Sequence, residues 1–215
     1  MNCSAVVLAG GRSRRMGSCK ALEPFRGRPL VHWTVEAMHG LTGDVVVSVS
    51  KGWGRQIGAA LFGNARIVED LHPRLGPVGG LEAGFRAASR EWVAVAPCDS
   101  PLPEPGLYRL LMAEAEGFDG AVPFLDGFPE PLHGVYRRRP MLRSLERVIS
   151  EGGGSVRDAL RLLKFARVGP RKLARADPRR ITFWNLSTRR ALRLAEKGLA
   201  ERVPARPDGP LRKAV

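Results

Sequence analysis

Residues 4–20 read SAVVLAGGRSRRMGSCK, and this stretch decides the fold. Its first part, residues 4–9, is a nearly continuous apolar run that is typical of a strand buried on both faces of a sheet. Two glycines follow directly, and glycine allows close approaches of backbone or ligand that other residues resist. Because ligands of open α/β sheets bind beyond the carboxyl ends of the strands, this basic loop predicts an anion site that fits a polyphosphate.

Further apolar, β-branched runs alternate with helical patterns along the first half of the chain. Alternation of this kind favours a mostly parallel sheet with helices on both faces, so we expect a three-layer α/β fold. The predicted strands are residues 4–9, 45–49, 65–68 and 92–96. One predicted helix begins at Pro29, and two others cover residues 80–90 and 105–116.

The second half of the sequence is less regular. After residue 200 it is rich in proline and charge and has little to bury. We expect a single domain over residues 1–200 and a flexible basic tail over residues 201–215. Within the domain, strands are predicted at residues 121–124, 132–136 and 181–184, and helices at residues 141–150, 155–163 and 188–199, with Ser155 as an N-cap.

The composition is strongly basic. The 215 residues carry a formal net charge of +14, from 35 lysines and arginines against 21 acidic residues. Such an excess favours anionic partners, either a phosphorylated small molecule or nucleic acid, and the alternative is a basic surface or tail without such a partner. Aromatic residues do not interleave with the basic clusters of the C-terminal third, as a base-stacking surface would require. The composition therefore disfavours nucleic acid as the partner.

Location and thiol chemistry follow from what the sequence offers. No apolar run approaches the ~20 residues that span a bilayer, and the N-terminus lacks a signal-peptide pattern. A cytoplasmic protein without a membrane partner is expected. The cysteines Cys3, Cys19 and Cys98 lie far apart without metal or redox spacing, which favours reduced thiols.

The loop after the first strand differs from two common phosphate loops. Gly17-Ser18-Cys19-Lys20 lacks the Gly-Lys-Ser/Thr order of a Walker loop. Gly10-Gly11 lacks the G-x-G-x-x-G spacing of a dinucleotide fingerprint. These mismatches indicate a phosphate loop of another type, and the alternative is a surface turn that carries incidental basic residues.

Residues 8–20, LAGGxSxRMGxxK, resemble the signature of MobA-like nucleotidyltransferases, in particular molybdenum cofactor guanylyltransferases, and residues 27–30 match the family's G-x-P-L. The resemblance implies a Rossmann-like fold of the nucleotide-diphospho-sugar-transferase type that binds GTP and Mg²⁺. It assigns catalysis to Lys20, Arg15 and Asp99, and nucleotide binding to Leu8, Ala9, Gly10, Gly11, Lys20, Ser50, Asp70, Gly79 and Asp99.

Asp99 follows the predicted strand 92–96, on the same rim as the glycine loop. A carboxylate there can serve a turn or a helix cap, or it can hold Mg²⁺ together with phosphate oxygens. The sequence Cys98-Asp99-Ser100-Pro101 is similar to the family's C-D-x-P, and that likeness implies Asp99 as the Mg²⁺ ligand.

Base recognition is expected from two other strand ends. Asp70 leads into residues 76–81, which match the family's G-P-x-x-G-L. This likeness implies that Asp70 and the loop lie beside the base or the ribose of the nucleotide. A carboxylate there would accept hydrogen bonds from guanine. Ser50 stands where guanylyltransferases of this family often carry an asparagine, which leaves GTP and CTP both open.

The acceptor side rests on two weaker likenesses. Residues 131–136 resemble the family's P-L-x-x-x-Y segment, and this likeness implies that Tyr136 lies on the acceptor side of the site. Residues 183–188 resemble F-x-N-x-N-T, with Ser187 in place of the second Asn, which implies Asn185 as a ligand of metal or acceptor. A helix start is an equal alternative for Asn185, and the lone His133 is expected to be structural.

The resemblance implies transfer of GMP from GTP to the terminal phosphate of molybdopterin, with release of pyrophosphate and later handover of the product to molybdoenzymes or their chaperones. Competing interpretations are a cytidylyltransferase, a guanylyltransferase with another phosphorylated acceptor, and a basic nucleic-acid-binding module. Gly10-Gly11 and the C-D-x-P motif favour the guanylyl type, because cytidylyl relatives more often read A-A-G and G-D-x-P.

Overall fold

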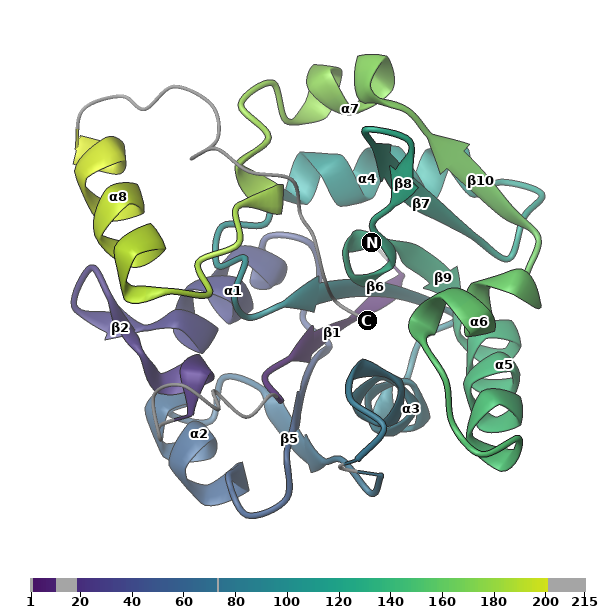
Figure 1. Cartoon of the computed structure of the whole chain (residues 1–215), viewed down its shortest axis with the longest axis horizontal. Helices are drawn as coiled ribbons and strands as arrows, with labels where there is room; N and C mark the ends of the chain where they lie inside the picture. The colour runs from purple at the N-terminus through teal and green to yellow at the C-terminus, as the bar shows by residue number, and fades with distance from the viewer. Residues whose placement is uncertain (1, 11–18, 73, 201–215) are drawn as a thin grey trace.

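The computed structural model describes residues 2–10, 19–72 and 74–200 (Figure 1). Strand β1 (Cys3–Leu8) lies inside the central sheet and pairs in parallel with β4 (Val45–Val49) on one side and β6 (Trp92–Pro97) on the other. Strand β5 (Arg66–Glu69) extends the sheet in parallel beyond β4. The four strands predicted in the first half of the chain are confirmed to within two residues at each end.

The other half of the sheet contains one reversed strand. β9 (Val135–Arg137) runs antiparallel between β6 and β7 (Gly120–Leu125), while β10 (Phe165–Val168) pairs in parallel with β7. The order is β10-β7-β9-β6-β1-β4-β5, with the short β8 (Phe128–Pro129) added antiparallel to β7. The sheet is therefore mostly parallel, as the sequence predicts.

Helices cover both faces of the sheet (Figure 1). Side chains of β1 alternate between the faces: Ala5 and Val7 pack in one apolar cluster, and Val6 and Leu8 in the other. The first face carries α1 (Leu30–His39), α2 (Gly54–Leu61), α4 (Pro105–Glu114) and α7 (Pro170–Ala176). The second face carries α3 (Pro77–Ala87), α5 (Arg138–Ser150) and α6 (Val156–Arg161).

Two predicted strands need correction. Residues 132–136 are divided between a 3-10 turn, η2 (Pro131–His133), and the start of β9. Residues 181–184 also form a 3-10 turn, η3 (Ile181–Phe183). The buried carboxylate of Asp177 explains this, because it accepts the backbone N–H groups of Ile181 and Thr182 and curls the chain.

The remaining predictions differ in detail. The helices predicted at residues 141–150, 155–163 and 188–199 are present, and Ser155 caps α6 through a capping box with Asp158. α3 begins three residues earlier than predicted, with Pro77 in its first turn. The helices α2 and α7 and the strand β10 were not predicted. The predicted tail, residues 201–215, lies outside the described residues, and the single-domain boundary stays a prediction.

A third, smaller core lies beside the sheet, and we call it the hairpin cluster. It joins the hairpin β2–β3 (Pro24–Phe25 and Arg28–Pro29) to α8 (Arg189–Ala200) and to the segment that precedes α8. Glu196 of α8 also accepts the backbone N–H of Arg26 at 2.8 Å. The buried members of the hairpin cluster are Phe25, Leu30, Trp184, Leu186, Leu192 and Ala195.

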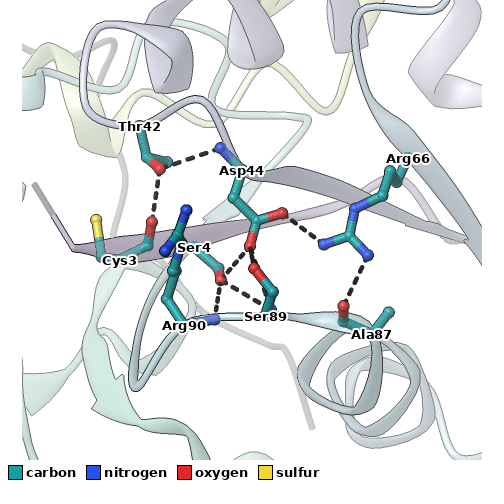
Figure 2. Close-up of polar contacts among 8 residues, drawn as sticks. All are labelled: Cys3, Ser4, Thr42, Asp44, Arg66, Ala87, Ser89 and Arg90. Carbon is teal, nitrogen blue, oxygen red and sulfur yellow. Dashed lines mark hydrogen bonds and ion pairs between the residues drawn. The ribbon is translucent and has the colours of Figure 1, made fainter.

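Polar side chains tie the amino-terminal ends of the strands together around Asp44 (Figure 2). Ser4 and Ser89 donate hydroxyl hydrogen bonds to one carboxylate oxygen at 2.5 and 2.6 Å, and Arg66 donates to the other at 2.5 Å. Burial alone would raise the pKa of the Asp44 carboxyl, but these hydrogen bonds lower it well below its usual range. The network stabilises the edge of the sheet that is opposite the glycine loop.

Two further sequence expectations concern thiols and membranes. Cys3, Cys19 and Cys98 are all free and buried. Burial raises the pKa of each thiol, which keeps it protonated and unreactive near neutral pH. In the described part of the chain, no helix has the length and apolarity needed to cross a bilayer.

Candidate active site at the carboxyl edge of the sheet

The glycine loop and the Asp99 loop leave the sheet side by side. Cys98 donates its backbone N–H to the carbonyl of Leu8 at 2.9 Å, so β1 and β6 remain paired to their last residues. On the other side, Ala9 donates to the carbonyl of Ser48 at 2.8 Å. Leu8, Ala9 and Gly10 therefore lie at the carboxyl edge, next to Asp99, as predicted.

Lys20 and Asp99 are in direct contact although 79 positions separate them in sequence. The ammonium Nζ lies 2.6 Å from Asp99 Oδ2, and the two side chains are 21% and 24% exposed. Lys20 is held by the 3-10 turn η1 (Lys20–Leu22), which buries Ala21 against the first face. The pair therefore places a cation and a carboxylate, both reachable by a ligand, on a fixed part of the edge.

Gly10 and Ser50 face each other between neighbouring strand ends. A β-carbon at Gly10 would lie 3.2 Å from Ser50 Oγ, so the backbone of the glycine loop comes close to that hydroxyl. Ser50 is half-buried, and its carbonyl accepts the N–H of Trp53 at 3.2 Å. Ser50 therefore lies at the base of the glycine loop.

Asp70 is packed under the start of α3. Its backbone N–H pairs with Val49 at the end of β4, and its Oδ1 accepts the N–H of His72 at 2.6 Å. The side chain is 7% exposed and touches the backbone of Gly79, where a β-carbon would clash with the same oxygen. Burial raises the pKa of this carboxyl, and Glu82 adds to the rise. Its contact with the base stays a prediction.

Asn185 reaches the same edge from the C-terminal segment. The next residue, Leu186, donates its backbone N–H to the carbonyl of Asp99 at 2.7 Å, and Asn185 itself is exposed. Trp184 and Leu186, on either side of it, are buried in the hairpin cluster. The sequence predicted Asn185 at the site, but it did not predict the backbone hydrogen bond from Leu186 to Asp99. The signal for it is a polar residue between two large apolar residues.

Tyr136 does not lie at the surface of this edge. It is fully buried, packs 6.2 Å from the ring of Phe85, and donates its hydroxyl to the carbonyl of Pro131 at 2.6 Å. Its ring therefore supports the η2 turn, and a direct contact with an acceptor stays a prediction that this packing disfavours. Gly11 and Arg15, also predicted here, lie outside the described residues.

Asp99 is the predicted metal ligand, and the surroundings limit what kind of metal site it can form. Within residues 2–10, 19–72 and 74–200, no group of three or more histidine, cysteine, aspartate or glutamate side chains could hold an ion. Mg²⁺ is commonly bound by one or two carboxylates together with substrate phosphates. The donors present therefore fit a metal that arrives with a triphosphate, and do not form a closed protein site.

The family model described as "MobA-like NTP transferase domain" matches residues 5–168. The chain belongs to this family. It is therefore a nucleotidyltransferase, and the resemblance stated from residues 8–20 is confirmed. The matched region begins in β1 and ends in β10, so it reaches every strand of the central sheet.

Named relatives agree with the family. The chain is 35% identical over 164 residues to a molybdenum cofactor guanylyltransferase of Pseudomonas putida strain KT2440, covering 74% of this chain and 82% of the relative. It is 27% identical over 203 residues to the molybdenum cofactor guanylyltransferase of Desulfosudis oleivorans, covering 91% and 95%. Both relatives belong to molybdenum cofactor biosynthesis by name.

A solved structure supports the fold. The crystal structure of molybdopterin-guanine dinucleotide biosynthesis protein A from Archaeoglobus fulgidus aligns with a TM-score of 0.78 and 27% sequence identity. The alignment covers 92% of this chain and 99% of that one. The three-layer fold with a mostly parallel sheet is therefore that of the MobA-like family.

Proposed function

We propose that this nucleotidyltransferase moves GMP from GTP to the terminal phosphate of molybdopterin and releases pyrophosphate. The observation that carries the proposal is the contact of Lys20 with Asp99 at the carboxyl edge, 2.6 Å apart, in a chain of the MobA-like family. The proposed nucleotide and acceptor are taken from the names of the relatives, which are called molybdenum cofactor guanylyltransferases.

The proposed reaction is an in-line displacement at phosphorus. An oxygen of the acceptor's terminal phosphate attacks the α-phosphorus of GTP and forms a new phosphorus–oxygen bond. The bond from the α-phosphorus to the bridging oxygen breaks, and pyrophosphate leaves with the electron pair. A phosphate nucleophile is already ionised near pH 7, so no general base is needed, and the protein contributes positioning and electrostatics.

Each residue at the edge has a part in this proposal. Lys20 would place its ammonium on the phosphates, and the backbone of Gly10 would approach them. Asp99 would hold Mg²⁺, which would neutralise charge on the phosphate oxygens when bound. Asn185, exposed beside Asp99, would contact the acceptor or the metal.

The choice of base depends on Asp70 and Ser50. Asp70 Oδ1 is engaged with His72, so a guanine would have to use the other oxygen or displace the His72 N–H. Ser50 offers one hydroxyl beside Gly10 in place of an amide's paired groups. Titration calorimetry with GTP and with CTP, each with Mg²⁺, measures this choice, and tighter binding of GTP is expected.

The surface next to Asn185 is basic. Arg189 and Arg190 open α8 and are exposed, and Thr188 caps the helix by accepting the N–H of Ala191 at 3.1 Å. Guanidinium groups bind phosphate oxygens well, and a basic surface raises the local concentration of an anionic acceptor. This charge supports a phosphorylated acceptor on the Asn185 side of Asp99.

The deciding experiment incubates the full chain with GTP, Mg²⁺ and molybdopterin and measures pyrophosphate release together with the dinucleotide product. Asp99→Ala should abolish turnover at saturating Mg²⁺ while the circular dichroism spectrum stays that of the native protein. Glu36→Gln, at an exposed carboxylate on α1, is the matched control and should keep full activity. Near-normal turnover by Asp99→Ala would make the metal assignment wrong.

A further inference from the structure

The ion pair between Lys20 and Asp99 is more enclosed than the other ion pairs of the described residues. In each of those other pairs at least one side chain is more than half exposed, whereas Lys20 and Asp99 are 21% and 24% exposed. Salt screens a partly buried pair less than an exposed one. The Lys20 ammonium is therefore held at 2.6 Å on Oδ2 of the carboxylate that is the predicted metal ligand.

The backbone on either side of this pair is held by other contacts. The carbonyl of Lys20 accepts the N–H of Glu23 at 3.1 Å, and Ala21 is buried in the core of the first face. The carbonyl of Asp99 accepts the N–H of Leu186 at 2.7 Å. The two side chains can therefore separate while the main chain of both loops stays in place.

The Lys20 ammonium and a divalent cation compete for the same carboxylate. An ammonium 2.6 Å from Asp99 Oδ2 repels a second cation that approaches this oxygen. The phosphates of a nucleotide change this balance in two ways. Their charged oxygens attract the ammonium away from Asp99, and they supply further ligands for a cation such as Mg²⁺.

We propose that Lys20 blocks the metal position on Asp99 in the free protein, so that a divalent cation enters this position only together with a triphosphate. This inference rests on the proposed function and deepens it, because the form of substrate that the site takes is the metal–nucleotide complex. Binding free energies are reciprocal, so the metal strengthens nucleotide binding by the same factor by which the nucleotide strengthens metal binding.

The amide of Leu186 is the reporter for the test, because it is bonded to the carbonyl of Asp99. Mn²⁺ at Asp99 broadens the nuclear magnetic resonance signal of this amide through its unpaired electrons. The full chain is titrated with Mn²⁺ alone, and the midpoint of the broadening is measured. Lys20→Gln should lower this midpoint by about 5- to 10-fold, a modest factor because a partly exposed ion pair is weak. The same spectra show that the variant is folded.

Two control variants separate the removal of the ammonium from other effects. Lys20→Arg keeps a cation beside Asp99 and should show the wild-type midpoint. Lys172→Gln removes another ion pair of 2.6 Å, between Lys172 of α7 and Glu114 of α4, and should leave the Leu186 midpoint unchanged. Equal midpoints in the wild type and Lys20→Gln would overturn the inference. A midpoint in Lys20→Arg as low as that in Lys20→Gln would also overturn it.

A second titration of the wild type contains saturating α,β-methylene GTP. The midpoint should fall by about 5- to 150-fold, the usual range for coupling between two ligands. An unchanged midpoint would contradict entry of the cation with the triphosphate. Neither titration contains an acceptor, so both outcomes stand even if the chain fails to transfer GMP to molybdopterin. Failure of that transfer with both expected midpoints contradicts the proposed acceptor alone.

Discussion

At the scale of single residues, the chemistry proposed for this edge depends on two side chains that lie far apart in the sequence. Lys20 and Asp99 meet only because β1 and β6 are adjacent and parallel, with Leu8 and Cys98 paired at their ends. Each group is partly exposed, so the pair itself stabilises the fold little. In the proposed function, the pair presents opposite charges to the same ligand.

Single glycines set how closely the helices approach the sheet. A β-carbon at Gly84 of α3 would overlap a methyl group of Val6 in β1. Gly84→Ala should therefore lower the free energy of unfolding by about 1–3 kcal/mol through overpacking. Urea denaturation followed by circular dichroism measures the change.

Gly58 of α2 provides the comparison within the same chain. A β-carbon there would lie 3.7 Å from the nearest atom, in ordinary contact with Ile67. Because alanine is the better helix former, Gly58→Ala should raise the free energy of unfolding by about 0.5–1 kcal/mol. Equal effects of the two substitutions would show that close packing of α3 is not the reason for Gly84.

At the scale of elements, the hairpin cluster links two sides of the site. The hairpin β2–β3 follows Lys20 in the chain, and α8 follows Asn185. Phe25 of the hairpin and Trp184 and Leu186 of the C-terminal segment share this cluster. A change in the packing of α8 should therefore reach both Lys20 and Asn185.

Leu192→Ala tests this coupling from within α8, 172 positions after Lys20 and seven positions after Asn185. The side chain is 6% exposed, so its truncation should lower the free energy of unfolding by about 2–5 kcal/mol. The KM values for the nucleotide and the acceptor should both rise in the variant that remains folded. Leu162→Ala, at a side chain 44% exposed on the end of α6, should change stability by less than about 0.5 kcal/mol and leave both KM values unchanged.

How far the sequence predicted these elements depended on the range of the contacts that form them. The strands Val45–Val49 and Trp92–Pro97 consist of local apolar runs, and their predicted bounds agree closely with the observed ones. The turn at Ile181–Phe183 was predicted as a strand, because its shape depends on the side chain of Asp177. A local apolar pattern contains no trace of such a bond.

The same limit applies to the candidate site. Asp99 and Asn185 were predicted at one edge from a family likeness, and the backbone bond from Leu186 to Asp99 brings them together. Burial of Tyr136, in contrast, results from its packing against Phe85, which is distant in sequence.

At the scale of the whole molecule, the carboxyl and amino-terminal ends of the strands differ in how their polar groups are paired. The carboxyl edge gathers groups that a ligand can reach, whereas the amino-terminal edge satisfies its polar groups internally around Asp44 (Figure 2). A carboxylate that accepts several hydrogen bonds in the native state stabilises that state while it remains ionised.

The stability of the whole chain should therefore depend on pH through Asp44. Its folded-state pKa is lowered, so the stabilisation is fully present above the unfolded value of about 3.9 and is lost as pH falls further. Asp44→Asn should lower the free energy of unfolding most at pH 7, and the difference from the wild type should shrink below about pH 4. Chemical denaturation at pH 7, 5 and 3 measures it, and a difference independent of pH would contradict the assignment.

The reversed direction of β9 alters which part of the chain can supply the site. Strands β1, β4 and β6 deliver residues to the carboxyl edge as the chain leaves them, whereas β9 delivers residues as the chain enters it. The β7–β8 hairpin and η2 immediately precede that entry. Insertions or deletions between Leu125 and Gly134 would therefore change this part of the carboxyl edge without changing the loops that follow β1, β4 and β6. Under the proposed function, such changes would alter the contacts to the acceptor and leave the contacts to the nucleotide base as they are.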